Sequence, residues 1–83
     1  MNNKLYVGNI PYPATEADLK QVFAKVGLVA KVEIVKDQRR RSRGYGFVEM
    51  SNLNEAREAM EKLNGHTLNV ASAERNLYVN FSH

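Results

Sequence analysis

The chain has 83 residues with a net charge of +3, and its 25% charged and 43% hydrophobic residues are typical of one folded domain spanning residues 1–83. It contains no cysteine, which excludes a disulfide framework, a thiolate metal site and thiol catalysis. No apolar run is long enough for a membrane span or a signal peptide, so we expect a cytoplasmic protein without a membrane partner.

The first half of the chain alternates between strand and helix signals. Apolar–polar alternation predicts a strand over residues 4–8, and a turn containing both prolines follows. Thr15 and Asp18 are expected to form a capping box at the start of a helix. Gly27 is expected to end this helix in a left-handed conformation, and a second strand is predicted over residues 29–36. The residues at helical spacing that would face the core are Leu19, Val22, Phe23 and Val26.

The segment that follows the second predicted strand is strongly basic. Residues 36–43 hold five cations against the single carboxylate of Asp37, so the rest of the chain is close to neutral. A local field of this kind favours a polyanion as partner, although a solvated loop that only aids solubility is the alternative. The five cations are Lys36, Arg39, Arg40, Arg41 and Arg43.

The second half of the chain repeats the alternation. A third strand is predicted over residues 44–50, and Asn52 with Glu55 is expected to form a second capping box. The helix that begins there should end at Gly65. A last strand is predicted over residues 76–81, with residues 67–70 pairing against it as an extra hairpin. The helix residues expected to face the core are Ala56, Ala59, Met60 and Leu63.

The order β-α-β-β-α-β predicts an α+β, ferredoxin-like sandwich, in which two helices cover one face of a four-stranded antiparallel sheet. Lys4, Glu33 and Glu49 would be costly under the helices, so their side of the strands should be the open face. An exposed aromatic cluster beside basic residues is suited to stacking nucleobases. The alternatives are cross-strand pairing that only stabilises the sheet and a protein-binding surface. Four of the seven aromatic residues share the open side: Tyr6, Tyr45, Phe47 and Tyr78.

Two segments carry a resemblance to a known family. LYVGNI at residues 5–10 and RGYGFVEM at residues 43–50 resemble the hexamer and octamer ribonucleoprotein motifs of the RNA recognition motif (RRM) family. The resemblance spans essentially the whole chain. A chain of this length is similar to stand-alone, single-motif bacterial and cyanobacterial members, and equally to one domain taken from a longer protein. Met50 stands where the family prefers an aromatic residue, but this position should face the core.

The resemblance implies binding of single-stranded RNA, in post-transcriptional regulation or RNA chaperoning. The residues themselves offer no catalytic constellation and no metal cluster, so we expect no catalysis, cofactor or metal, and a monomer is the default expectation. It implies that Tyr6, Tyr45 and Phe47 lie side by side and stack bases. Arg43 is implied to pair with the phosphate backbone. Tyr78 is added to the stacking surface from the strand pattern alone. Further phosphate contacts are expected from Arg39, Arg40 and Arg41, and base-edge hydrogen bonds from Lys4, Glu33, Glu49, Asn80 and the backbone near Ser82.

Other functions share this fold or this surface. Acylphosphatases resemble the chain in topology, but they need an arginine in the loop after the first strand, and residues 8–12 contain no cation. Protein-binding variants of the RRM family usually lose the octamer aromatics, which this chain keeps. Single-stranded DNA stays open as a partner, because stacking and phosphate contacts do not distinguish the sugar.

Overall fold

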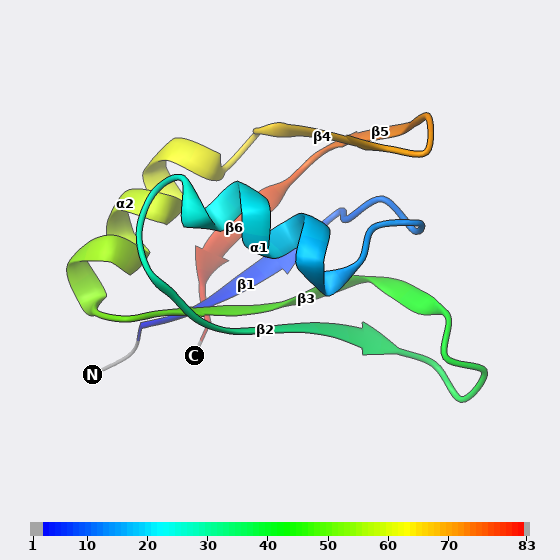
Figure 1. Ribbon diagram of the computed structural model, residues 1–83, viewed down its shortest axis with the longest axis horizontal. Helices are drawn as coiled ribbons and strands as arrows, with labels where there is room; N and C mark the ends of the chain where they lie inside the picture. The colour runs from blue at the N-terminus through cyan, green and yellow to red at the C-terminus, as the bar shows by residue number, and fades with distance from the viewer. Residues whose placement is uncertain (1–2, 83) are drawn as a thin grey trace.

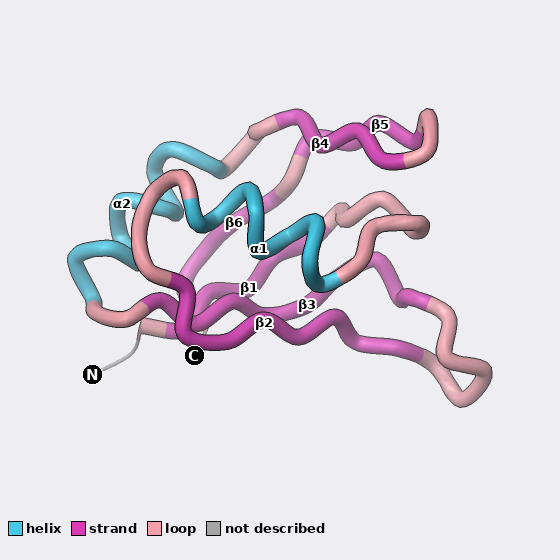
Figure 2. The backbone as a smooth tube through the Cα atoms, viewed as in Figure 1, coloured by secondary structure: helices cyan, strands magenta, loops and turns pink. Residues whose placement is uncertain are grey.

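A computed structural model describes residues 3–82 of the chain (Figure 1). Its main sheet has four antiparallel strands in the order β2-β3-β1-β6, and α1 and α2 both lie on one side of it (Figure 2). The predicted ferredoxin-like sandwich is therefore confirmed. The elements are β1 (Lys4–Gly8), α1 (Glu16–Ala24), β2 (Val29–Lys36), β3 (Ser42–Met50), α2 (Leu53–Leu63), β4 (Thr67–Val70), β5 (Ala73–Asn76) and β6 (Tyr78–Phe81).

The core lies between the helices and the sheet, and alternate strand residues build it. Leu5 of β1 faces Val48 of β3 in register, and both side chains are fully buried. Phe23 of α1 and Ala59 of α2 pack into the same cluster. Met50 is also fully buried, as its place in the strand pattern predicts. Because each large aliphatic side chain contributes about 1.5–3 kcal/mol when buried, this face accounts for much of the folding energy.

The two helices begin differently. At α1 the predicted capping box is confirmed: the Thr15 amide donates to the Asp18 carboxylate at 2.9 Å, and the Asp18 amide donates to the Thr15 hydroxyl at 3.2 Å. At α2 only half of the predicted box forms. The Glu55 amide donates to Asn52 Oδ1 at 2.8 Å, but the Glu55 carboxylate turns away. It accepts hydrogen bonds from the Ser51 hydroxyl at 2.7 Å and the Leu28 amide at 2.9 Å, and so joins the start of α2 to the loop after α1.

Those two hydrogen bonds have an electrostatic consequence. The Ser51 hydroxyl, followed by the Leu28 amide, holds the pKa of the Glu55 carboxyl below its ordinary value. Both donors favour the charged carboxylate over the protonated acid. This link between the two helical segments is therefore stronger when Glu55 is ionised.

The end of α1 differs from the prediction. The helix stops at Ala24, Lys25 keeps a right-handed φ of −72°, and the left-handed glycines of the described chain are Gly44 and Gly65. The expectation of a left-handed Gly27 is therefore wrong. Gly27 has a different structural reason, because a side-chain carbon built there would collide with the Glu55 carboxylate.

The extra hairpin also forms with a different partner. Residues 67–70 pair with Ala73–Asn76 rather than with the last strand, through a turn in which Ala71 and Ser72 both have positive φ. Leu77 then separates β5 from β6, because its amide donates to the His66 carbonyl at 2.8 Å and its carbonyl accepts from the Gly65 amide at 2.7 Å. The predicted strand over residues 76–81 therefore divides, and the sheet strand begins at Tyr78.

Gly46 lies in the middle of β3, opposite Val7 of β1 and Ile34 of β2. It is buried, and a side-chain carbon built on it would run into the Glu33 carbonyl of the neighbouring strand. The absence of a side chain at this position allows β2 and β3 to approach each other closely.

Candidate nucleic-acid interface

Four aromatic rings form one cluster on the open face of the sheet. The Tyr6 ring lies at its centre, with ring centroids 5.8 Å from Tyr45, 6.0 Å from Phe47 and 6.0 Å from Tyr78. Tyr6 and Tyr45 are stacked at 28°, whereas the other two pairs meet edge to face. Tyr78 is 49% exposed and the other three are partly buried by one another. The structure therefore brings together all four aromatic residues that the strand pattern assigned to this face.

The strand register explains why these rings meet. Tyr6 of β1 faces Phe47 of β3, and Gly8 of β1 faces Tyr78 of β6. The Tyr6 ring leans along its own strand over Gly8, so a side-chain carbon built at Gly8 would lie 3.0 Å from Tyr6 Cε1. A glycine at this position therefore leaves room for the central ring.

Charged residues surround Phe47 at one margin of the cluster. The Lys4 ammonium lies 4.8 Å from the Phe47 ring centroid, within the range of a cation–π contact. Glu49 faces Lys4 in register, and Glu33 faces Phe47. Three of the residues expected to read base edges are thus placed beside Phe47, one of the rings expected to stack a base.

The other margin is already partly engaged within the protein. Asn80 Nδ2 donates to the Tyr78 hydroxyl at 3.2 Å, and Asn80 Oδ1 accepts from the Phe81 backbone amide at 2.8 Å. The Ser82 amide donates to the Lys4 carbonyl at 2.9 Å, so that donor is committed to the sheet. Of the groups expected at this margin, Asn80 lies beside the rings and the Ser82 amide is occupied.

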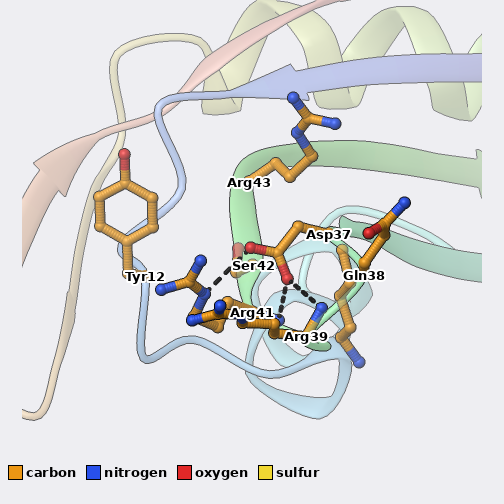
Figure 3. Close-up of a pocket in the computed structure, with 8 residues that line it drawn as sticks. Tyr12, Asp37, Gln38, Arg39, Arg41, Ser42 and Arg43 are labelled. Atoms are coloured by element: carbon orange, nitrogen blue, oxygen red, sulfur yellow. Dashed lines mark hydrogen bonds and ion pairs between the residues drawn. The ribbon is translucent and has the colours of Figure 1, made fainter.

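Residues 37–41 of the basic segment fold as a tight turn around Asp37, which we call the basic turn (Figure 3). The Asp37 carboxylate accepts from the Arg39 amide at 2.8 Å, the Arg41 amide at 2.9 Å and Arg41 Nε at 3.0 Å. Arg40 has a positive φ of 64°, which completes the turn. The Arg41 amide, with further donors from Arg39 and the Arg41 side chain, holds the pKa of Asp37 below its ordinary value. The turn therefore keeps its one carboxylate ionised and presents its arginines outward.

The turn that carries Arg39, Arg40 and Arg41 lies beyond the ends of β2 and β3 (Figure 1). The pairing of β2 with β3 is irregular here, since Gly46 faces Ile34 but Ser42 faces Lys36. Strict alternation therefore does not run from Tyr45 back to Arg43. Arg43 is exposed, and its guanidinium points away from the Asp37 carboxylate (Figure 3). The predicted site thus has two parts, a ring cluster on the sheet and a basic turn at its end.

Tyr12 and Arg75 join the second part, and the sequence reasoning missed both. Tyr12 is 61% exposed and shares a surface cavity of about 660 Å³ with the basic turn, including Arg41, and with Arg43 of β3. The Arg75 guanidinium lies 5.5 Å from the Tyr12 ring centroid. Neither residue belongs to an alternating strand pattern of the main sheet, so the periodicity carried no signal for them. The available signal was the tyrosine's place between two prolines, in a segment outside every predicted strand and helix.

Two absences within residues 3–82 bear on the site. No group of three or more histidine, aspartate or glutamate side chains there is arranged to hold a metal ion. Nor does this part of the chain contain a helix with the length and apolar character needed to cross a bilayer.

The protein is a ferredoxin-like sandwich, and the face of its sheet that no helix covers carries the ring cluster. Residues 5–71 match the RNA recognition motif family, and the chain belongs to that family. A solved structure of the RNA15 RRM has a TM-score of 0.87 and 33% identity, covering 98% of this chain and 90% of that one. A structure of the Rna15 RRM with bound RNA (GU) has a TM-score of 0.81 and 31% identity, covering 99% of this chain and 84% of that one.

A similar curated protein is the chloroplastic RNA-binding protein CP33 of Arabidopsis thaliana. It is 44% identical over 79 residues, which are 94% of this chain and 23% of that protein. Three further relatives, from Arabidopsis thaliana and Nicotiana sylvestris, are also named as chloroplastic. The chain spans about a fifth to a quarter of the length of these relatives.

These names correct two expectations. The predicted cytoplasmic location is wrong, because the four relatives are chloroplast proteins. Those relatives also come from plants rather than bacteria, so they do not support a bacterial single-motif type. The physical reason for the first error is simple: the residues of a folded domain carry no record of the compartment in which it works.

Proposed function

We propose that residues 1–83 form one RNA recognition motif domain that binds single-stranded RNA. The domain acts without catalysis, as a monomer, and needs neither a metal nor a membrane. The observation that carries this proposal is the cluster of four rings on the sheet face that no helix covers. The Rna15 RRM, solved with bound RNA (GU), has the same fold and supports the proposal.

Stacking supplies the main attraction in this proposal. Unstacked bases lie on Tyr6, Tyr45 and Phe47, with Tyr78 extending the surface, and each stacked base contributes about 1–3 kcal/mol. The phosphates meet Arg43 and the basic turn formed by residues 37–41. If about four phosphates are neutralised, a plot of the logarithm of the binding constant against the logarithm of the salt concentration should have a slope of about −3.

Specificity in this proposal comes from the margins of the ring cluster. Lys4, Glu33 and Glu49 surround Phe47, and Asn80 lies beside Tyr78. Donors and acceptors there can read base edges, whereas the rings accept any base. A small domain with this division binds a few nucleotides with limited sequence preference, which suits RNA chaperoning or post-transcriptional regulation.

The proposal is tested by selecting a binding sequence from a random single-stranded RNA pool. The selected RNA and its DNA counterpart are then titrated against the protein while backbone chemical shifts are followed. We expect the RNA to shift β1, β3 and β6, with weaker binding to DNA. Shifts confined to α1 and α2, or an absence of binding, would contradict the proposal. Equal binding of the DNA counterpart would contradict the preference for RNA and would make single-stranded nucleic acid in general the ligand.

A further inference from the structure

Tyr12 is a large ring whose position the core does not explain. It is 61% exposed, yet it is not loosely held. A side-chain carbon built at Gly44 would lie 3.4 Å from Tyr12 Cε1, so this part of the ring lies close to the backbone of β3 where that strand has no side chain. The Ile10 amide donates to the Gly44 carbonyl at 2.8 Å and fastens the loop before Tyr12 to the same point.

Arg75 reaches this ring from the β4–β5 hairpin. Its guanidinium lies over the Tyr12 ring at 5.5 Å from the centroid. Arg75 Nη1 donates to Asn9 Oδ1 at 2.9 Å, and Asn9 Nδ2 donates to the Asn76 carbonyl at 2.9 Å. Three segments distant in the sequence thus hold one exposed ring in place before any ligand arrives. A ring that is ordered in advance loses little conformational entropy when it binds.

The opposite wall of the cavity is the basic turn (Figure 3). Arg41 binds Asp37 through its amide and Nε, and its terminal nitrogens make no hydrogen bond to the described residues. Asp37, the one carboxylate on the cavity wall, is occupied by donors from Arg39 and Arg41. The cavity therefore faces an exposed aromatic ring on one side and arginine donors on the other. A nucleotide has both complementary parts, a base that stacks and a phosphate that pairs with arginine.

We infer that the bound RNA continues past the sheet into this cavity, where one further nucleotide stacks its base on Tyr12 and places its phosphate against Arg41 and Arg43. The inference rests on the proposed RNA-binding function and extends it. The ring cluster and the cavity are thus two successive binding sites for one RNA chain. A short RNA occupies the first contact alone, and only a longer RNA reaches both.

This length dependence gives the test. Oligouridylates of three and eight nucleotides, which have little structure of their own, are titrated against the protein by chemical-shift perturbation. We expect Tyr12→Ala to weaken binding of the octanucleotide roughly tenfold, near the low end of the contribution of one stacked base, and to leave the trinucleotide unaffected. Tyr12→Phe keeps the ring and should bind both as the unaltered chain does. Leu28→Ala removes another exposed apolar side chain, 69% exposed, and serves as the matched control.

The possible results separate cleanly. Equal octanucleotide affinity in Tyr12→Ala and the unaltered chain would overturn the inference, and so would an equal loss for both lengths, which would place Tyr12 at the ring cluster. Failure of the unaltered chain to bind either oligonucleotide would overturn the proposed function, and this inference with it. That last result is recognisable because it occurs with Tyr12 intact.

Discussion

The two faces of the main sheet are built from the same strands and serve opposite purposes. Leu5 and Tyr6 are adjacent in β1, yet Leu5 is fully buried under the helices while Tyr6 lies among the rings on the open face. Val48 and Phe47 repeat this division in β3. One strand register therefore positions both the core and the candidate binding surface. Substitutions of adjacent residues should therefore separate folding stability from RNA affinity.

The largest effect is expected on the helix-covered face. Leu5→Ala removes a fully buried side chain and leaves a cavity, so the free energy of unfolding should fall by about 2–5 kcal/mol. Denaturant unfolding measures this loss. Without denaturant, and at a temperature at which the variant remains folded, its RNA affinity should match that of the unaltered chain. A matching loss of affinity would show that the two faces are not separable.

The next effect is expected on the open face. Phe47→Ala removes a partly buried ring of the cluster, and RNA affinity should fall by about 1–3 kcal/mol, or roughly 5- to 150-fold. Fluorescence anisotropy with a labelled RNA measures the change, and Phe47→Tyr is the control that keeps a stacking ring. If Phe47→Ala bound RNA as tightly as Phe47→Tyr does, the rings would serve only the sheet.

A smaller effect for each residue is expected at the basic turn. Replacing Arg39, Arg40 and Arg41 by glutamine should weaken binding across RNA sequences and reduce the steepness of the salt dependence by about 2, since each lost phosphate contact removes ~0.7. Affinities measured over a series of salt concentrations give the slope. Arg57→Gln, on the exposed surface of α2, is the control. An unchanged slope in the triple variant would mean that the turn takes no part in binding.

The smallest effect concerns pH and the helix side. The pKa of Glu55 is lower in the folded chain than its ordinary 4.5, so its carboxylate stabilises the fold above pH 4.5. This contribution is lost as the pH falls below 4.5 and through the lower, folded pKa. Thermal unfolding should show Glu55→Gln less stable than the unaltered chain at pH 7, with the difference shrinking at pH 3. A difference that stayed constant with pH would mean that the charge of Glu55 is irrelevant.

The sequence predicted the sheet and its ring cluster well because alternation ties each strand residue to one of two faces. Tyr6, Phe47 and Tyr78 could be placed from this rule alone, and Met50 could be assigned to the core. The rule fails where strands are irregular or end. It could not place Arg43 beyond the irregular pairing at Gly44, and it says nothing about a loop residue such as Tyr12.

The other errors came from local signals with more than one solution. A glycine near a helix end often adopts a left-handed conformation, but Gly27 instead makes room for the Glu55 carboxylate. Residues 67–70 could pair with either neighbouring extended segment, and they pair with the nearer one through a turn in which Ala71 and Ser72 have positive φ. The first choice depends on a contact between residues distant in the sequence, and the second on which of two similar local pairings forms; a pattern along the chain specifies neither.

Gly46 shows how far a ligand surface can depend on a residue that no ligand meets. Its missing side chain faces the helices, while the rings of Tyr45 and Phe47 project from its two neighbours to the opposite side. A methyl group there would run into the backbone of β2 at Glu33, so β2 and β3 would have to shift apart. The spacing of β2 and β3 behind the ring cluster therefore depends on a residue that has no side chain.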